Sequence, residues 1–365
     1  MKMDKSEIRN LLLVVFVFIA GSFLFQILGL IIIQNEAPSL NGIWNRWDAP
    51  HYTDIAEKGY VAEGDDKVLI AFFPLYPALI RLFNYAFNNF ALSALVVSNL
   101  AYLLAAFYLY RLVRLDYNKK TALSAVFLFS IFPTAYFLHA GYTESLFIAL
   151  IVASFYYARV GKWWLASLIG LFASATRITG FLLFPALAVE YLSQSKFKLK
   201  SIRKDVFWLA LVPVGLFAYL AINYLIFGNP LYFMSAQSEH WTTSLSPPWH
   251  GLWGSWNTMM TWESFVDRAM LGGAALVFGS LAWIFVFYSF FRQRLSYALY
   301  VAGSVLVFTS ASFLVSTPRY VLSLFPIYIM LASRKSDAVQ YCTIFISLLL
   351  HFLFFIQFVR GQWAF

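Results

Sequence analysis

The sequence predicts an all-α polytopic membrane protein. Of its 365 residues, 61% are hydrophobic and 12% are charged, and the mean hydropathy is +0.71. A chain of this composition cannot keep a globular surface wetted, so it is not a water-soluble protein. Apolar runs long enough to cross a bilayer follow one another from residue 11 to residue 358. We therefore expect one transmembrane domain over residues 1–365.

Basic residues set the expected path of the chain through the membrane. The net charge is +9, and lysines and arginines fall in short clusters between the apolar runs. Such clusters are typical of cytoplasmic loops and give no support for nucleic-acid binding. The clusters expected inside are Lys2/Lys5/Arg9, Arg111/Arg114/Lys119/Lys120, Arg159/Lys162, 196–204, Arg292/Arg294 and Arg334/Lys335.

About eleven transmembrane helices follow from this rule, with the N-terminus inside and the C-terminus outside. We expect them at residues 11–33, 91–113, 121–139, 145–159, two short helices within 163–192, 206–227, 268–291, 296–316, 319–333 and 338–359. The two short helices turn near 176–180, because a single crossing there would leave the next basic cluster outside. The first helix is too long for a signal-peptide core and is expected to be retained.

Two long loops are expected on the outer side, at about 34–90 and 228–267. Within the first, residues 68–90 carry Pro74 and Pro77 and would reverse the inside-outside alternation if they spanned, so we expect an interfacial or re-entrant helix. The second loop is rich in tryptophan, and its three prolines are expected to break any helix.

This topology gathers scarce ionisable residues on the outer side. Charged groups at membrane depth are costly and usually mark a function or a fixed pair. The residues are Asp48, His51, Glu144, Arg177, His240 and Arg319, with Arg46 beside Asp48 in the first loop. We therefore expect a site that faces outward.

Asp48 has two compatible interpretations. It can cap a short helix that has an Asp54–Lys58 pair on its surface and ends at Gly59. It can also act as a general base, because even a carboxylate of low pKa suffices where the leaving group departs ahead of proton removal, as in oxocarbenium-like glycosyl transfer.

Arg177 and Arg319 are suited to clamp a phosphate, because a guanidinium binds oxyanions through two hydrogen bonds and keeps its charge. The alternative is interfacial snorkelling, or a pair with Glu144 or another acid. His51 and His240 are either ordinary hydrogen-bonding histidines or substrate contacts.

Metal and disulfide chemistry have little support. The acids of the first loop have no recognisable ligand spacing, so no metal or other cofactor is expected. The single Cys342 excludes an internal disulfide. The tryptophans of the second loop are typical interfacial anchors, and they could also stack on sugar rings or a prenyl chain.

Five motifs carry a resemblance that runs along most of the chain. They are RWDAPHYTDIAEKGY with AFFPLYP in the first loop, GYTESLF at 141–147, ATRITGFLLFP at 175–185, FGNPLYFMSAQSEHW at 227–241 and PRYVLSLFP at 318–326. In this order they resemble the GPI mannosyltransferase 2 (PIG-V) family and its prokaryotic relatives, which are membrane glycosyltransferases of the GT-C class.

The resemblance implies an inverting transferase that moves mannose from a polyprenyl or dolichyl phosphate to an acceptor hydroxyl on the outer or luminal face. It makes Asp48 the presumed catalytic base and Arg177 and Arg319 the ligands of the donor phosphate. Arg46, His51, Glu144 and His240 are further candidates for substrate contact. The acceptor would be a lipid-linked glycan, a cell-wall polymer or a glycolipid.

The membrane would be that of a prokaryotic cell, or the endoplasmic reticulum of a eukaryote with a luminal site. No long soluble segment is present to hold a nucleotide-sugar domain. The main alternative is a lipid-linked sugar flippase or other transporter, which would show polar residues on both sides of the midplane. A third hypothesis is a silent subunit that positions a partner enzyme.

Overall fold

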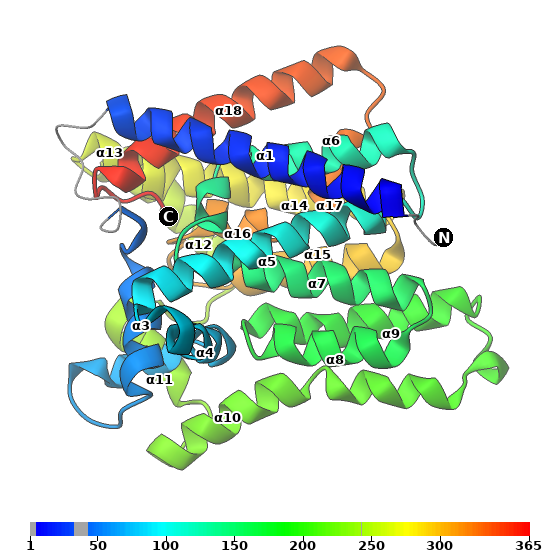
Figure 1. Cartoon of the computed structure of the whole chain (residues 1–365). Helices are drawn as coiled ribbons and strands as arrows, with labels where there is room; N and C mark the ends of the chain where they lie inside the picture. The colour runs from blue at the N-terminus through cyan, green and yellow to red at the C-terminus, as the bar shows by residue number, and fades with distance from the viewer. Residues whose placement is uncertain (1–4, 33–42, 242) are drawn as a thin grey trace.

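The chain forms a bundle of helices that run side by side along one axis (Figure 1). The structure is a computed structural model that describes residues 5–32, 43–241 and 243–365. Within these residues the only β-structure is an isolated bridge between Leu245 and Ala311. Lys2, the last residue of the predicted helix 11–33 and the start of the predicted loop 34–90 lie outside the described residues.

Five described segments are long and apolar enough to cross a membrane. They are Leu11–Ile31 within α1 (Lys5–Ile32), α5 (Phe90–Val113), Lys204–Phe227, Phe265–Arg292 and α18 (Asp337–Val359). Lys204–Phe227 joins η5 (Lys204–Leu211) to α10 (Val214–Phe227), and Phe265–Arg292 joins α13 (Phe265–Asp267), the π-helix η6 (Arg268–Ala274) and α14 (Ala275–Arg292). The chain is an integral membrane protein, and the number eleven stays a prediction.

Helix breaks account for the other differences from the predicted boundaries. The predicted helix 121–139 is α6 (Lys119–Ser130) followed by the 3₁₀ turn η2 (Ala135–Leu138), with Pro133 in the gap. The predicted helix 296–316 ends early, as α15 (Leu295–Thr309). The predicted helix 319–333 is wrong, because the chain forms α16 (Thr317–Leu322) and a separate α17 (Pro326–Ala332). Pro326 has no N–H to continue a helix, so it starts a new one.

The predicted pair of short helices is confirmed. α7 (Glu144–Arg159) leads into α8 (Trp163–Ser174), and the chain then turns through η3 (Ile178–Leu182) into α9 (Leu183–Gln194). A 3₁₀ turn, η4 (Leu199–Ser201), follows. Arg177 lies at the turn between the two short helices, immediately before η3, in extended conformation.

Both long loops contain helices that lie against one end of the bundle. The first holds α3 (Asp48–Lys58), η1 (Asp65–Ala71) and α4 (Leu75–Phe87), and η1 and α4 bend by 107° as in a broken span or a re-entrant loop. The second holds α11 (Tyr232–Trp241) and α12 (Pro248–Thr261). The prediction that prolines break any helix there is wrong, because Pro248 occupies the first helical position, where no N–H is needed.

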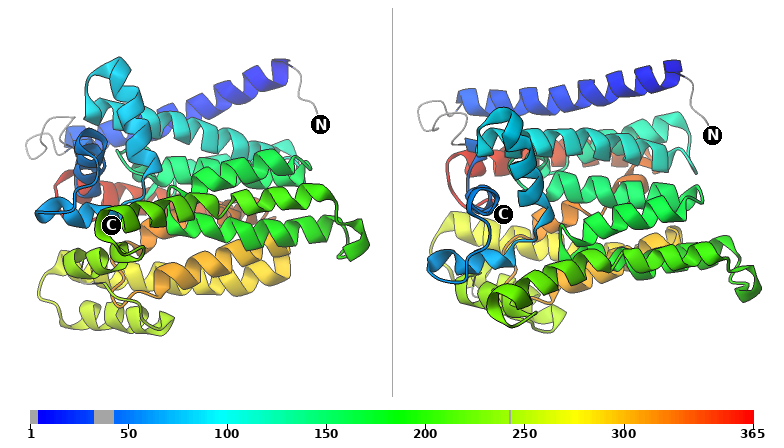
Figure 2. Two further views of the ribbon diagram at one scale, coloured as in Figure 1. Left: turned by 90° about the horizontal axis from the view of Figure 1, so that it is seen from below. Right: turned by 60° about the horizontal axis from the view of Figure 1, so that its bottom comes forward.

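The two ends of the bundle carry separate ionic clusters. α7 begins at Glu144, which pairs with Arg177, and runs to Arg159, which binds Asp116 at 2.7 Å. Beside Arg159, the wholly buried Glu190 accepts hydrogen bonds from Ser296 at 2.6 Å and Arg294 at 3.0 Å. In Figure 2 the segment of α3 and α4 lies at the end of the bundle away from the N-terminus. The Glu144 end, beside this segment, carries the candidate site.

Candidate active site

The chain enters α3 in a strained conformation that a distant tyrosine holds. Trp47 has a φ of +56°, which is unusual for a residue other than glycine. The hydroxyl of Tyr142 donates to the carbonyl of Arg46 at 2.8 Å and accepts from the backbone N–H of Asp48 at 3.2 Å. Tyr142 thereby fixes the direction in which the Asp48 side chain leaves the helix.

The prediction that Asp48 caps α3 is wrong. Trp47 holds the N-cap position without a side-chain hydrogen bond, and Asp48 is the first helical residue. The rest of the predicted helix is confirmed: Asp54 and Lys58 approach to 4.0 Å on the exposed surface, and Gly59, with a φ of +81°, ends the helix. The Asp48 carboxylate is therefore available for another partner.

That partner is Arg319, at the start of a row of alternating charges. Nη1 of Arg319 donates to Oδ2 of Asp48 at 2.8 Å, and its Nε lies 3.1 Å from Oε1 of Glu144. The same Oε1 accepts a hydrogen bond from Nη1 of Arg177 at 2.8 Å. Two carboxylates and two guanidiniums thus alternate, and their formal charges cancel.

Both guanidiniums also make cation–π contacts with neighbouring aromatic rings. The Arg319 guanidinium lies 5.3 Å from the ring centres of Phe137 and Tyr142, and that of Arg177 lies 5.2 Å from the ring of Tyr320. Contacts of this kind attract the cation to the ring face and are stronger when water is excluded. Because the side chains of Arg319 and Arg177 are only 10% and 17% exposed, both charges are held in fixed positions.

Asp48, Arg177 and Arg319 line one cavity of about 400 Å³. Residues of α11, α15 and the segment after α15 also line it, and many of them are apolar. The apolar lining includes Phe233, Met234, Val307, Phe308, Phe313 and Leu314. Among the described residues that line the cavity, Asp48 is the only acid. The cavity therefore joins one carboxylate and two fixed cations to a wall that suits a hydrocarbon chain.

Two predicted candidates lie behind the cavity. Glu144 is wholly buried and does not line it, so its visible role is to hold Arg177 and Arg319. Arg46 does not line it either, and its guanidinium lies against Gly361 in the last segment of the chain. Of the two, Glu144 supports lining side chains directly.

The two histidines come together at the rim. The His51 ring lies 6.2 Å from the ring of His240 and 5.4 Å from the ring of Phe72, which lines the cavity. Burial lowers the pKa of His51, although the nearby Asp48 carboxylate opposes this shift. His51 is therefore predominantly neutral at pH 7.

Several aromatic residues of the site escaped the sequence analysis. Tyr142 orders the Asp48 backbone, while Tyr52 and Trp363 line the cavity. Tyr142 stands inside the GYTESLF motif and Tyr52 follows the first-loop histidine, so motif position is a signal that could have found them. Trp363 lies in the last segment and carries no such signal.

No cluster of three or more histidine, cysteine, aspartate or glutamate side chains that could hold a metal ion occurs among the described residues. Cys342 is exposed, with a free thiol.

Solved structures identify the fold. The chain is similar to ArnT from Cupriavidus metallidurans, solved bound to undecaprenyl phosphate, with 14% identity and a TM-score of 0.57. This match covers 90% of the chain and 62% of ArnT. It confirms the predicted GT-C-like helical fold.

Curated relatives match by sequence over part of their length. GPI alpha-1,6-mannosyltransferase 2 of Mus musculus is 34% identical over 152 residues, covering 39% of this chain and 30% of the relative. The Homo sapiens protein of the same name is 30% identical over 213 residues, covering 52% of this chain and 42% of the relative. The chain thus spans less than half the length of the relatives it matches.

The family model described as mannosyltransferase (PIG-V) matches residues 27–249. This range includes Asp48, Glu144 and Arg177. Arg319 lies beyond the range, and its ion pair with Asp48 places it beside the first loop. Since the match covers more than half of the chain, the predicted family is confirmed: this chain belongs to the mannosyltransferase (PIG-V) family.

Proposed function

We propose that this chain is an inverting membrane glycosyltransferase that moves a sugar, mannose by family, from a polyprenyl phosphate to an acceptor hydroxyl. The observation that carries the proposal is the cavity that Asp48, Arg177 and Arg319 line together with many apolar side chains. A lipid-phosphate donor needs a cationic site for its phosphate, an apolar surface for its first prenyl units and a carboxylate for the incoming hydroxyl.

The single carboxylate among the described lining residues suffices for one displacement step with inversion. Inverting glycosidases use a second carboxyl group only to protonate the leaving group. A phosphate leaving group needs no protonation when two guanidiniums stabilise it. Asp48 therefore suffices as the base.

The charge balance of this step gives Arg319 a role. The acceptor oxygen forms a bond to the anomeric carbon, the bond from that carbon to the phosphate oxygen breaks with its electron pair on the phosphate, and the acceptor proton passes to Asp48. Asp48 changes from −1 to neutral while the phosphate changes from −1 to −2. Arg319 pairs with Asp48 before the reaction. Once Asp48 is protonated, Arg319 can pair with the leaving phosphate instead.

We further propose that the site faces the extracytoplasmic side. Lysines and arginines gather at the opposite end of the bundle, where they bind Asp116 and Glu190 or are exposed. The acceptor would be a glycan or glycolipid in the same leaflet, and the reaction would proceed without a metal cofactor.

The test is transfer of labelled mannose by the purified protein in detergent. We expect transfer from polyprenyl phosphomannose to a lipid-linked glycan or glycolipid acceptor, with inversion at the anomeric carbon, and none from GDP-mannose. Equal use of GDP-mannose, or retention of configuration, would refute the proposal.

Reconstitution into vesicles distinguishes the alternatives. Movement of the labelled lipid between leaflets without a new glycosidic bond would support a flippase. Activity that requires a copurified partner would support a silent subunit. The proposed enzyme forms the product alone in detergent, where no second leaflet exists.

A further inference from the structure

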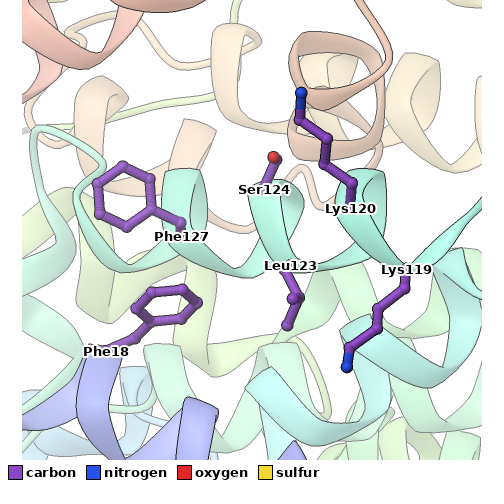
Figure 3. Close-up of a pocket in the computed structure, with 6 residues that line it drawn as sticks. All are labelled: Phe18, Lys119, Lys120, Leu123, Ser124 and Phe127. Carbon is purple, nitrogen blue, oxygen red and sulfur yellow. The ribbon is translucent and has the colours of Figure 1, made fainter.

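An open surface groove lies far from the candidate active site, between α1 and α6. It has a volume of about 650 Å³ and is lined by Phe18, Lys119, Lys120, Leu123, Ser124 and Phe127 (Figure 3). Lys119 begins α6 shortly after Asp116, and Asp116 binds Arg159 at the far end of α7 from Glu144. The groove is thus at the opposite end of the bundle from the Asp48 cavity.

The groove is apolar along its length and positive at one end. Phe18 of α1 and Phe127 of α6 face each other with ring centres 5.5 Å apart, and Leu123 lies between them and the lysines. The two lysines stand on the first turn of α6, roughly 10 to 12 Å along the helix from Phe127. A ligand that fits this layout has an anionic head and a hydrocarbon chain.

The two lysines have no internal counter-ion, in contrast to Arg159 and Arg294 at the same end of the bundle. At this end Arg159 pairs with Asp116, and Arg294 pairs with Glu190. Lys119 and Lys120 are exposed and form no salt bridge with any side chain that the structure describes. Their charge is therefore available to an external anion.

We propose that this groove binds an anionic glycerophospholipid, with its phosphate at the end that carries Lys119 and Lys120 and an acyl chain along Leu123, Phe127 and Phe18. Two observations favour a phospholipid of the surrounding leaflet. The lysines lie at the end of α6, where a lipid headgroup would be, and the apolar floor runs from there toward the middle of the bundle. Basic pockets between membrane helices are known to bind anionic headgroups.

The experiment measures lipid adducts on the intact purified protein by native mass spectrometry, after reconstitution in phosphatidylcholine with a minor fraction of phosphatidylglycerol. We expect a phosphatidylglycerol adduct in preference to phosphatidylcholine. Each lysine near a membrane surface contributes roughly a fivefold preference. The double variant Lys119→Gln/Lys120→Gln should therefore reduce the preference roughly 25-fold.

Two further variants separate the groove from general charge attraction. Lys196→Gln/Lys198→Gln makes the same change of charge at exposed positions of the loop after α9, and it should leave the adduct unchanged. Ser124→Trp fills the groove without changing charge and should remove the adduct. Thermal unfolding confirms that each variant is folded.

Three outcomes would overturn the proposal. The first is a wild-type protein without preference for phosphatidylglycerol. The second is an equal loss of preference in the Lys196→Gln/Lys198→Gln control, which would show attraction to the whole basic end. The third is displacement of phosphatidylglycerol by a smaller amount of polyprenyl phosphate, which would make the groove a carrier site. None depends on the proposed transferase activity.

Discussion

Replacing Glu144 by Gln should destabilise the protein and yet increase its affinity for polyprenyl phosphate. Glu144 is wholly buried, with Oε1 at 2.8 Å from Arg177 and 3.1 Å from Arg319. The substitution keeps the shape and removes the charge, which leaves the two guanidiniums with Asp48 as their one carboxylate partner among the described residues. Removing one partner of a buried ion pair costs about 3 kcal/mol, so Tm should fall by several degrees.

The effect on phosphate binding follows from Coulomb's law. A donor phosphate on the far side of a guanidinium would lie roughly 6 to 7 Å from the Glu144 carboxylate, given two hydrogen-bond lengths and the width of the group. At an effective dielectric constant of about 20, their repulsion is about 2.5 kcal/mol, an upper limit of roughly sixtyfold in affinity. The aromatic contacts of Arg177 and Arg319 remain in the variant. We therefore expect polyprenyl phosphate to bind about tenfold more tightly.

Glu190→Gln is a matched control. Glu190 is also wholly buried and also binds two arginines, but at the opposite end of the bundle. It should lose a similar amount of stability without a change in affinity. Calorimetric titration with polyprenyl phosphate and thermal unfolding give both quantities. Equal affinities in the two variants, or a loss of affinity confined to Glu144→Gln, would refute the reasoning.

Three further predictions concern the phosphate, the rim and the metal requirement. Arg177→Gln removes charge-assisted hydrogen bonds and should weaken donor affinity roughly tenfold to a hundredfold, whereas Arg203→Gln, exposed at the opposite end, should not. Burial lowers the pKa of His51, so the folded protein binds fewer protons than the unfolded chain between that pKa and the ordinary histidine pKa of about 6.5. Wild-type Tm should therefore fall more steeply than that of His51→Gln as pH decreases through this window, and identical slopes would contradict the shift. Chelation with EDTA should leave the rate of sugar transfer unchanged. A loss of transfer that a divalent cation restores would show that the enzyme needs a metal.

The sequence analysis placed residues that are remote in the chain on the same side of the membrane. Asp48 and Arg319 are 271 positions apart, and the rule that basic clusters stay inside was enough to put them on one side with Arg177. Their contact in one cavity is consistent with that placement. The family, recognised from five colinear motifs, is confirmed.

The errors arose where tertiary contacts override local pattern. Asp48 has the sequence context of a helix cap, but Tyr142, 94 residues away, fixes the backbone so that Trp47 takes that position. For Glu144 the sequence left substrate contact and a pair with the arginines open, and the structure shows the pairs with Arg177 and Arg319. Hydropathy also cannot detect breaks such as the one before Pro326, because both sides of the break are equally apolar.

The central claim is that Asp48 accepts the proton of the acceptor hydroxyl. The most direct test is the single-turnover rate of sugar transfer from bound polyprenyl phosphomannose, with Asp48→Asn compared with Asp54→Asn, the same change on the exposed side of α3. The account predicts that Asp48→Asn binds the donor at least as tightly as wild type but transfers at least about a hundredfold more slowly, whereas Asp54→Asn transfers normally. Wild-type transfer by Asp48→Asn would contradict it.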